Sequence, residues 1–80
     1  MERIGVIFGK VIRRRRSELG LSQEAFADKA GIHRTYMSSI ERGKVQVSIL
    51  IAYQLAAALE IRCSELWQEI EDDIDRSAKT

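Results

Sequence analysis

Apolar residues recur at three- and four-residue steps along the 80-residue chain, which is the spacing of one face of a helix. Ile4 and Phe8 begin this pattern, and no stretch alternates apolar and polar residues for long enough to form a strand. The pattern is interrupted at Gly20, Gly31 and Gly43, and glycine is a common residue just beyond the end of a helix. The sequence therefore predicts an all-α fold of five short helices.

The expected helices cover residues 4–19, 23–30, 34–42, 49–60 and 64–74. Ser22, His33, Ser48 and Ser64 precede four of these segments and are expected to act as N-caps. The fourth segment is apolar nearly all round, which places it at the centre of the core. Residues 1–74 are thus predicted to form one domain, and residues 75–80 a polar C-terminal tail that frays.

Composition and motifs argue against several classes of protein. Cys63 is the only cysteine, so the sequence allows neither an intramolecular disulfide nor a cysteine-rich zinc site, and His33 has no partner at ligand spacing. No apolar run is long enough to span a membrane, and the basic residues follow the N-terminal apolar stretch, unlike those of a signal peptide. Phosphate-loop, dinucleotide and nucleophile-elbow motifs are missing. We expect a cytoplasmic protein that is not an enzyme, requires no metal or cofactor and has no membrane partner.

The charges are divided unevenly along the chain, although the formal net charge is only +1. Residues 1–44 hold ten Lys and Arg against five Asp and Glu, which gives +5. Residues 45–80 hold three against seven, which gives −4. The low net charge therefore does not exclude a polyanionic partner, because one half of the chain is basic.

Residues 23–30 and 34–42 have the outline of a helix-turn-helix, because a tight turn at Gly31–His33 joins the two short helices. Met37 and Ile40 form the inward side of the second helix. Its outward side consists of Arg34, Thr35, Ser38, Ser39 and Arg42. Small serines let a helix lie deep in the major groove, and an arginine can contact guanine O6 and N7. This face fits DNA reading, and an ordinary solvated helix face is the alternative.

Several motifs carry a resemblance to a known family. They are Phe8-Gly9-Lys10-Val11-Ile12-Arg13, Gly20-Leu21-Ser22-Gln23-Glu24-Ala25-Phe26-Ala27, and His33-Arg34-Thr35-Tyr36-Met37-Ser38-Ser39-Ile40-Glu41-Arg42-Gly43. With them, about residues 8–67 resemble the XRE/Cro-type (lambda-repressor-like) helix-turn-helix family. The chain looks most like the small dimeric controller proteins of restriction–modification systems. Phage-type repressors and antitoxins, or other protein-binding modules of this family, are the alternatives.

The resemblance implies a sequence-specific transcriptional regulator that binds a palindromic operator in double-stranded DNA as a homodimer, on the nucleoid of a bacterium or on phage DNA. Base contacts are expected from Arg34, Thr35, Ser38 and Ser39. Phosphate contacts are expected from Ser22, Gln23, His33, Tyr36, Arg42, Lys44 and Gln46. Controller-like relatives often carry Arg-Asn where this chain has Val45-Gln46, so a phosphate contact at Val45 is lost. RNA polymerase is a further candidate partner.

Glu41 would repel phosphate if it faced DNA. In the family the equivalent glutamate points inward and pairs with an arginine of the first helix. Helical phase leaves Arg15 and Arg16 beside the apolar stripe, and the distance to Gly20 in the family pattern selects Arg16. We therefore expect a structural ion pair between Arg16 and Glu41. The four arginines at 13–16 point all round their helix, so we expect a mainly solvated face, with a DNA contact by Arg13 or Arg14 as the alternative.

The dimer needs an apolar surface away from the DNA. The fifth helix carries an apolar stripe of Leu66, Trp67, Ile70 and Ile74. The first three are the expected dimer interface, with Ile74 and part of the fourth helix as further candidates. The alternative is that Trp67 simply covers the monomer core. If the protein is an antitoxin, the same stripe would hold a different partner protein.

Overall fold

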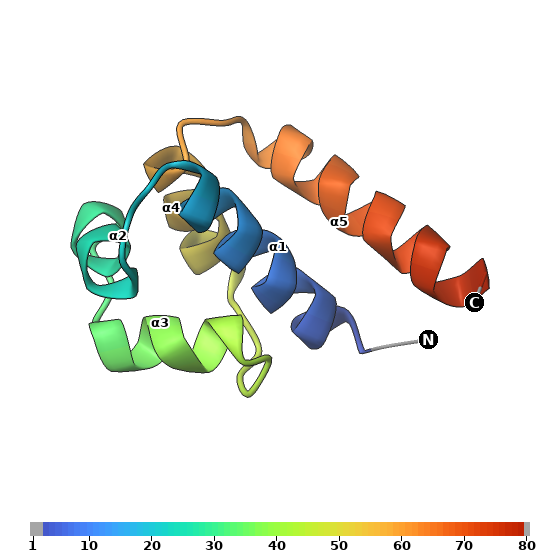
Figure 1. Cartoon of the computed structure of the whole chain (residues 1–80), viewed down its shortest axis with the longest axis horizontal. Coiled ribbons are helices and arrows are strands. Elements are labelled where there is room, and N and C mark those ends of the chain that lie inside the picture. Colours follow the sequence, from blue (N-terminus) through green and yellow to red (C-terminus); the bar gives the residue numbers. More distant parts are fainter. Residues whose placement is uncertain (1–2, 80) are drawn as a thin grey trace.

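The computed structural model describes residues 3–79, which form five helices and no strand, so the predicted all-α class is confirmed. The helices are α1 (Ile4–Glu18), α2 (Gln23–Ala30), α3 (Arg34–Glu41), α4 (Ile49–Ala58) and α5 (Cys63–Lys79). α1 lies between α3 on one side and α5 on the other, and α2 contacts both α3 and α4 (Figure 1). This arrangement leaves α3 at the edge of the molecule with one face in solvent. Within the described residues, no helix combines the length and apolar character needed to cross a membrane.

Predicted caps fix the starts of α2 and α4. The backbone N–H of Ala25 donates to Ser22 Oγ at 3.0 Å, and that of Ile51 donates to Ser48 Oγ at 3.1 Å. Each serine thereby satisfies a backbone donor that has no partner within the first helical turn. α2 ends at Gly31, whose φ of 72° lies in the left-handed region that favours glycine.

α5 differs from the prediction at both ends. It begins at Cys63, and the backbone N–H of Glu65 donates to the Arg62 carbonyl, so Ser64 lies inside the first turn and does not cap the helix. The helix then continues through residues 75–79, where the sequence analysis expected a frayed tail. Ion pairs from α1 reach Glu69 and Asp73 in the middle of α5, and Arg76 pairs with Asp73 one turn earlier on the same helix.

One hydrophobic core joins all five helices. Its largest fully buried side chains are Val11, Ile12, Phe26, Met37, Ile40, Leu55, Leu66 and Ile70. Met37 and Ile40 are thus buried, as predicted for the inward side of α3. The expectation that α4 lies at the centre of the core is only partly correct: Leu55, Ala56 and Ala58 are buried, but Ile49 and Leu50 at its start are exposed. The C-terminal half of α4 supplies its fully buried residues, while Ile51 and Ala52 of the N-terminal half pack against the core and are half-buried.

Two glycines bring the backbone of α1 against the end of α3. A Cβ atom on Gly9 would lie 2.4 Å from the Ile40 carbonyl oxygen and 2.7 Å from the Glu41 carbonyl oxygen. Gly43 follows α3 with a φ of 70°, and a Cβ atom there would lie 2.8 Å from the Cα of Val6. No side chain fits between the two backbones at either point, so α1 directly supports the C-terminal end of α3.

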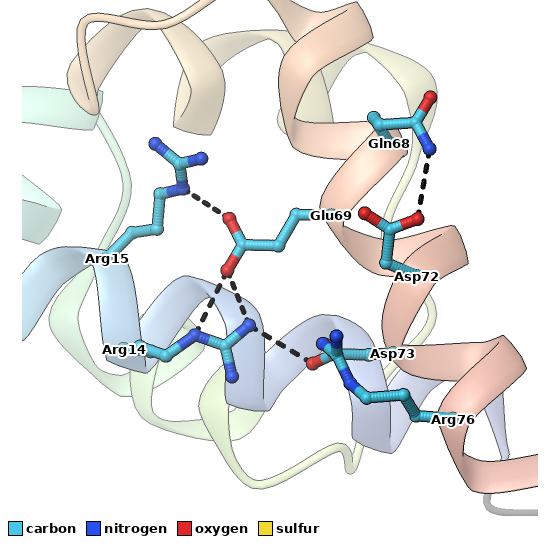
Figure 2. A network of polar contacts seen from close by, with 7 residues as sticks. All are labelled: Arg14, Arg15, Gln68, Glu69, Asp72, Asp73 and Arg76. Atoms are coloured by element: carbon cyan, nitrogen blue, oxygen red, sulfur yellow. Dashed lines mark hydrogen bonds and ion pairs between the residues drawn. The ribbon is translucent and has the colours of Figure 1, made fainter.

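A network of ion pairs joins α1 to α5 (Figure 2). Arg14 contacts Glu69 and Asp73, Arg15 contacts Glu69, and Arg76 pairs with Asp73 on α5 itself. Partial burial alone would raise the pKa of Glu69, but hydrogen bonds from Arg14 and Arg15 and their charges outweigh burial and lower it. Arg14 and Arg15 are therefore engaged by α5, so the expectation of a solvated face is wrong for these two arginines, and the pairing of Arg14 argues against the alternative that it contacts DNA.

Candidate nucleic-acid interface

The exposed face of α3 and the first turn of α2 form an open groove of ≈ 470 Å³. Its lining residues are Ser22, Gln23, Glu24, Arg34, Thr35, Ser38 and Arg42. Three of the expected base-reading residues, Arg34, Thr35 and Ser38, thus share one concave surface with three of the expected phosphate contacts. Ser39 is half-buried and does not line this groove. The serines leave the middle of the face low, which a helix needs to approach base edges closely.

The remaining expected phosphate contacts do not line this groove, and Lys44 and Gln46 line a second groove together with Ile49 and Trp67. Lys44 and Gln46 are exposed in the segment between α3 and α4, and Tyr36 is half-buried against the core. The backbone N–H of Thr35 donates to His33 Nδ1 at 3.2 Å, so His33 caps α3 as predicted. A neutral imidazole in this position carries its proton on Nε2. In the part of the chain that the structure describes, no three His, Cys, Asp or Glu side chains are placed to hold a metal ion.

Glu41 connects three helices beneath this surface. Its side chain is 2% exposed, and that of its partner Arg16 is 13% exposed. Arg16 Nε and Nη2 donate to the two carboxylate oxygens at 2.7 and 3.0 Å, while Arg16 Nη1 donates to the Leu21 carbonyl at 2.7 Å. Gln23 Nε2 donates to Glu41 Oε1 at 3.0 Å. The predicted Arg16–Glu41 pair is present, and it fixes α1, the start of α2 and the end of α3 relative to one another.

Two contacts within the interface were not expected from the sequence. Gln23 was assigned to phosphate alone, yet one N–H of its amide is used inside the protein by Glu41. Arg34 was assigned to a base alone, yet its Nη1 donates to Glu24 Oε2 at 3.1 Å. In each of these two contacts the residues lie on different helices, so the spacing rules for side chains on one helix could not predict either contact.

A second exposed surface is apolar. Four large apolar side chains on α4 and α5 are exposed. On α4 they are Ile49 (90% exposed), Leu50 (67%) and Tyr53 (65%), and on α5 Trp67 (48%). We call these four residues the α4–α5 patch. Ile49 and Trp67 also line a neighbouring groove of ≈ 850 Å³, together with Ile4 and Cys63.

The predicted dimer interface needs a correction at this point. Leu66 and Ile70 are 1% and 0% exposed and belong to the monomer core, so they offer no surface to a second chain. The reason is helical phase, since neighbouring residues of a helix point in directions about 100° apart. Of the three residues named for this interface, Trp67 alone remains on the surface. Ile49 of α4, the helix expected to contribute a part of the interface, lines the same neighbouring groove as Trp67.

The helix-turn-helix geometry agrees with the comparisons with known proteins. A helix-turn-helix family profile matches residues 12–66, and the chain belongs to this family, in its XRE-type branch. It is 42% identical over 74 residues to the control protein C.MunI from Mycoplasma sp, which is 91% of this chain and 100% of that protein. It is 38% identical over 64 residues to the control protein C.BamHI from Bacillus amyloliquefaciens, 79% of each chain.

A solved structure extends this similarity to three dimensions. The crystal structure of the restriction-modification controller protein C.AhdI from Aeromonas hydrophila matches with a TM-score of 0.74 and 43% sequence identity. The match covers 76% of this chain and 92% of that chain. The resemblance inferred from the sequence motifs is therefore confirmed at the level of the family and the fold.

Proposed function

We propose that this protein is a sequence-specific transcriptional regulator that serves as the controller of a restriction–modification system. The groove that brings Arg34, Thr35 and Ser38 together on an exposed helix face is the observation that carries the proposal. The similarity to C.MunI and C.BamHI, both named control proteins, supports the controller role.

In this proposal α3 enters the major groove of the DNA. The Arg34 guanidinium donates two hydrogen bonds to a guanine, and the Thr35 methyl group contacts a thymine methyl. Ser22 and Gln23 lie at the start of α2, where hydroxyl, amide and helix N-terminus can bind a phosphate. Lys44 and Gln46, which follow α3 in the chain, lie along the phosphate backbone of the DNA on the other side of α3. Phosphate contacts fix the register of the protein, and the base contacts select the sequence.

The protein acts on a palindromic operator as a homodimer. One short recognition helix makes few base contacts, and such modules commonly bind two half-sites about 34 Å apart. The α4–α5 patch supports this assembly, because it leaves large apolar side chains in solvent on helices that pack mainly against α2 and α1. At its promoter, on the bacterial nucleoid, the bound dimer either blocks RNA polymerase or recruits it.

Two variants test base reading. Arg34→Ala should weaken operator binding by about 1–3 kcal/mol, which is about 5- to 150-fold, and relax the preference at one base pair. Lys44→Ala should weaken binding to operator and random DNA alike, because a phosphate contact is independent of sequence. Footprinting upstream of the protein's own gene locates the operator, and fluorescence anisotropy measures both affinities. If Arg34→Ala lost equal affinity on both DNAs, Arg34 would not be a base reader.

A further variant tests the dimer. Trp67→Ala should give monomers in light scattering and much weaker operator binding, because Trp67 is the large aromatic residue on the α5 side of the patch. Leu19→Ala is the matched control, since Leu19 is 43% exposed and lies outside the patch. A Trp67→Ala protein that remains dimeric at the concentrations where the wild type is dimeric would reject this interface.

A further inference from the structure

We propose that Glu24 is a positioning residue for Arg34, and that it increases the specificity of DNA binding by keeping the Arg34 guanidinium away from phosphates. The inference rests on the proposed function, in which Arg34 contacts a base. It assigns a role to a carboxylate in a surface that is otherwise built to bind an anion.

The geometry lets Glu24 and a guanine share the same guanidinium. Glu24 is in the first turn of α2, Arg34 is the first residue of α3, and both line the groove. Arg34 Nη1 donates to Glu24 Oε2 at 3.1 Å. A guanidinium has five N–H groups, so this contact leaves enough donors for a bidentate contact to guanine O6 and N7. Arg34 therefore does not have to release Glu24 in order to read a base.

The contact does little for the stability of the fold. The side chains of Arg34 and Glu24 are 66% and 65% exposed, and ion pairs so open to water stabilise a folded protein weakly. Its effect is on the conformation of a long side chain that would otherwise sample many rotamers. A guanidinium held in place before binding loses less freedom when DNA arrives.

The charge of Glu24 also makes the Arg34 site favour a base edge over a phosphate. Arg34 lies in one groove with Ser22, Gln23 and Arg42, the residues expected to hold the DNA backbone. Without a carboxylate beside it, the guanidinium would pair with a nearby phosphate, which every DNA sequence supplies. With Glu24 in place, such a phosphate would meet a like charge, whereas the edge of a guanine carries no net charge. Glu24 thus weakens binding to random-sequence DNA more than it weakens binding to the operator.

The test compares Glu24→Gln with Asp28→Asn. Asp28 is exposed one turn later on α2, so its substitution removes the same charge without touching Arg34. The probes are the tightest duplex selected by the wild-type protein from a randomised library and a random-sequence duplex of equal length, each titrated over a series of KCl concentrations. For Glu24→Gln we expect the ratio of the two affinities to fall about tenfold, mainly through tighter binding to random DNA.

The salt dependence gives a readout that a structural role would not change. On random DNA, the slope of log K against log[KCl] should steepen by about 0.9 for each Arg34 that gains a phosphate. Asp28→Asn should keep both the affinity ratio and the slope close to those of the wild type. If Glu24→Gln matched Asp28→Asn in ratio and slope, the inference would be overturned.

Arg34→Ala distinguishes this failure from failure of the proposed function. If Arg34→Ala keeps full discrimination at every base pair, Arg34 is not a base reader and both proposals fail together. If Arg34→Ala loses discrimination but Glu24→Gln behaves as Asp28→Asn does, the positioning role alone fails. In the Arg34→Ala background, Glu24→Gln should leave the affinity ratio unchanged. A further loss of base preference in that background would mean that Glu24 reads a base itself, and would also overturn the inference.

Discussion

Replacing Glu41 with glutamine removes the buried charge that joins α1 to α3. The glutamine keeps the size of the side chain, but it no longer carries the charge that faces Arg16. Arg16, whose side chain is 13% exposed, then loses two charge-assisted hydrogen bonds, and only neutral acceptors remain: the Leu21 carbonyl and the single amide oxygen of the glutamine. A neutral backbone carbonyl does not compensate a guanidinium that is shielded from water.

The expected loss is a large share of the stability of this chain. Breaking a buried ion pair by removing one partner costs about 3 kcal/mol, because the other charge stays buried. At roughly 0.05–0.15 kcal/mol per residue, a chain of 80 residues has a total free energy of unfolding of about 4–12 kcal/mol. At about 4–8 °C per kcal/mol for a domain of this size, Tm should fall by about 12–24 °C.

Thermal unfolding followed by circular dichroism, together with urea titration, measures this loss. Glu18→Gln is the control, because Glu18 is exposed at the end of α1 and loses the same charge; its Tm should stay within about 4 °C of the wild type. The double variant Arg16→Met/Glu41→Met leaves no buried charge and should regain more than half of the lost stability. A Glu41→Gln protein that unfolds at the wild-type temperature would refute the reasoning.

Two further predictions concern the contacts of α1. Gly9→Ala should lower the free energy of unfolding by about 3 kcal/mol in urea titration, because the new Cβ would lie 2.4 Å from the backbone of α3. Gly5→Ala in the first turn of α1, whose Cβ would have its nearest neighbour at 3.9 Å, is the matched control and should change it by no more than about 0.5 kcal/mol. The lowered pKa of Glu69 predicts stability that is present above the ordinary value of 4.5 and lost as the pH falls through the folded-state pKa. Urea midpoints should therefore drop below pH 4.5 in the wild type, and Glu69→Gln should flatten this part of the profile while Glu71→Gln, an exposed control, should not.

The sequence predicted those parts of the fold that depend on local signals. Ser22 and Gly31 mark the two ends of α2 through a cap and a left-handed turn, and both signals operate within a few residues. The inward position of Met37 and the outward position of Arg34 follow from helical phase alone. Most of the residues that line the groove are therefore predictable from the sequence.

The features that were missed depend on contacts between distant residues. The ion pair between α1 and α5 joins Arg14 and Glu69, which lie 55 positions apart, and no local rule connects them. The exposed first turn of α4 has the composition of a buried helix, and only the packed structure shows that Ile49 lies beyond the core. Leu66 and Trp67 are adjacent in the sequence, and the direction of each is decided by how α5 docks on α1 and α4.

The close approach of α1 to α3 at Gly9 and Gly43 also limits which DNA sites can be bound. The two backbones approach with no side chain between them, and α1 also packs against α5, so α3 and Trp67 are both positioned by α1. In the proposed dimer this arrangement sets both the distance and the rotation between the two copies of α3. One base pair added between half-sites turns one of them by roughly 34–36° about the DNA axis, given about 10–10.5 base pairs per turn. Because α3 and α5 both pack against α1, the spacing of the half-sites should be selected as well as their sequence.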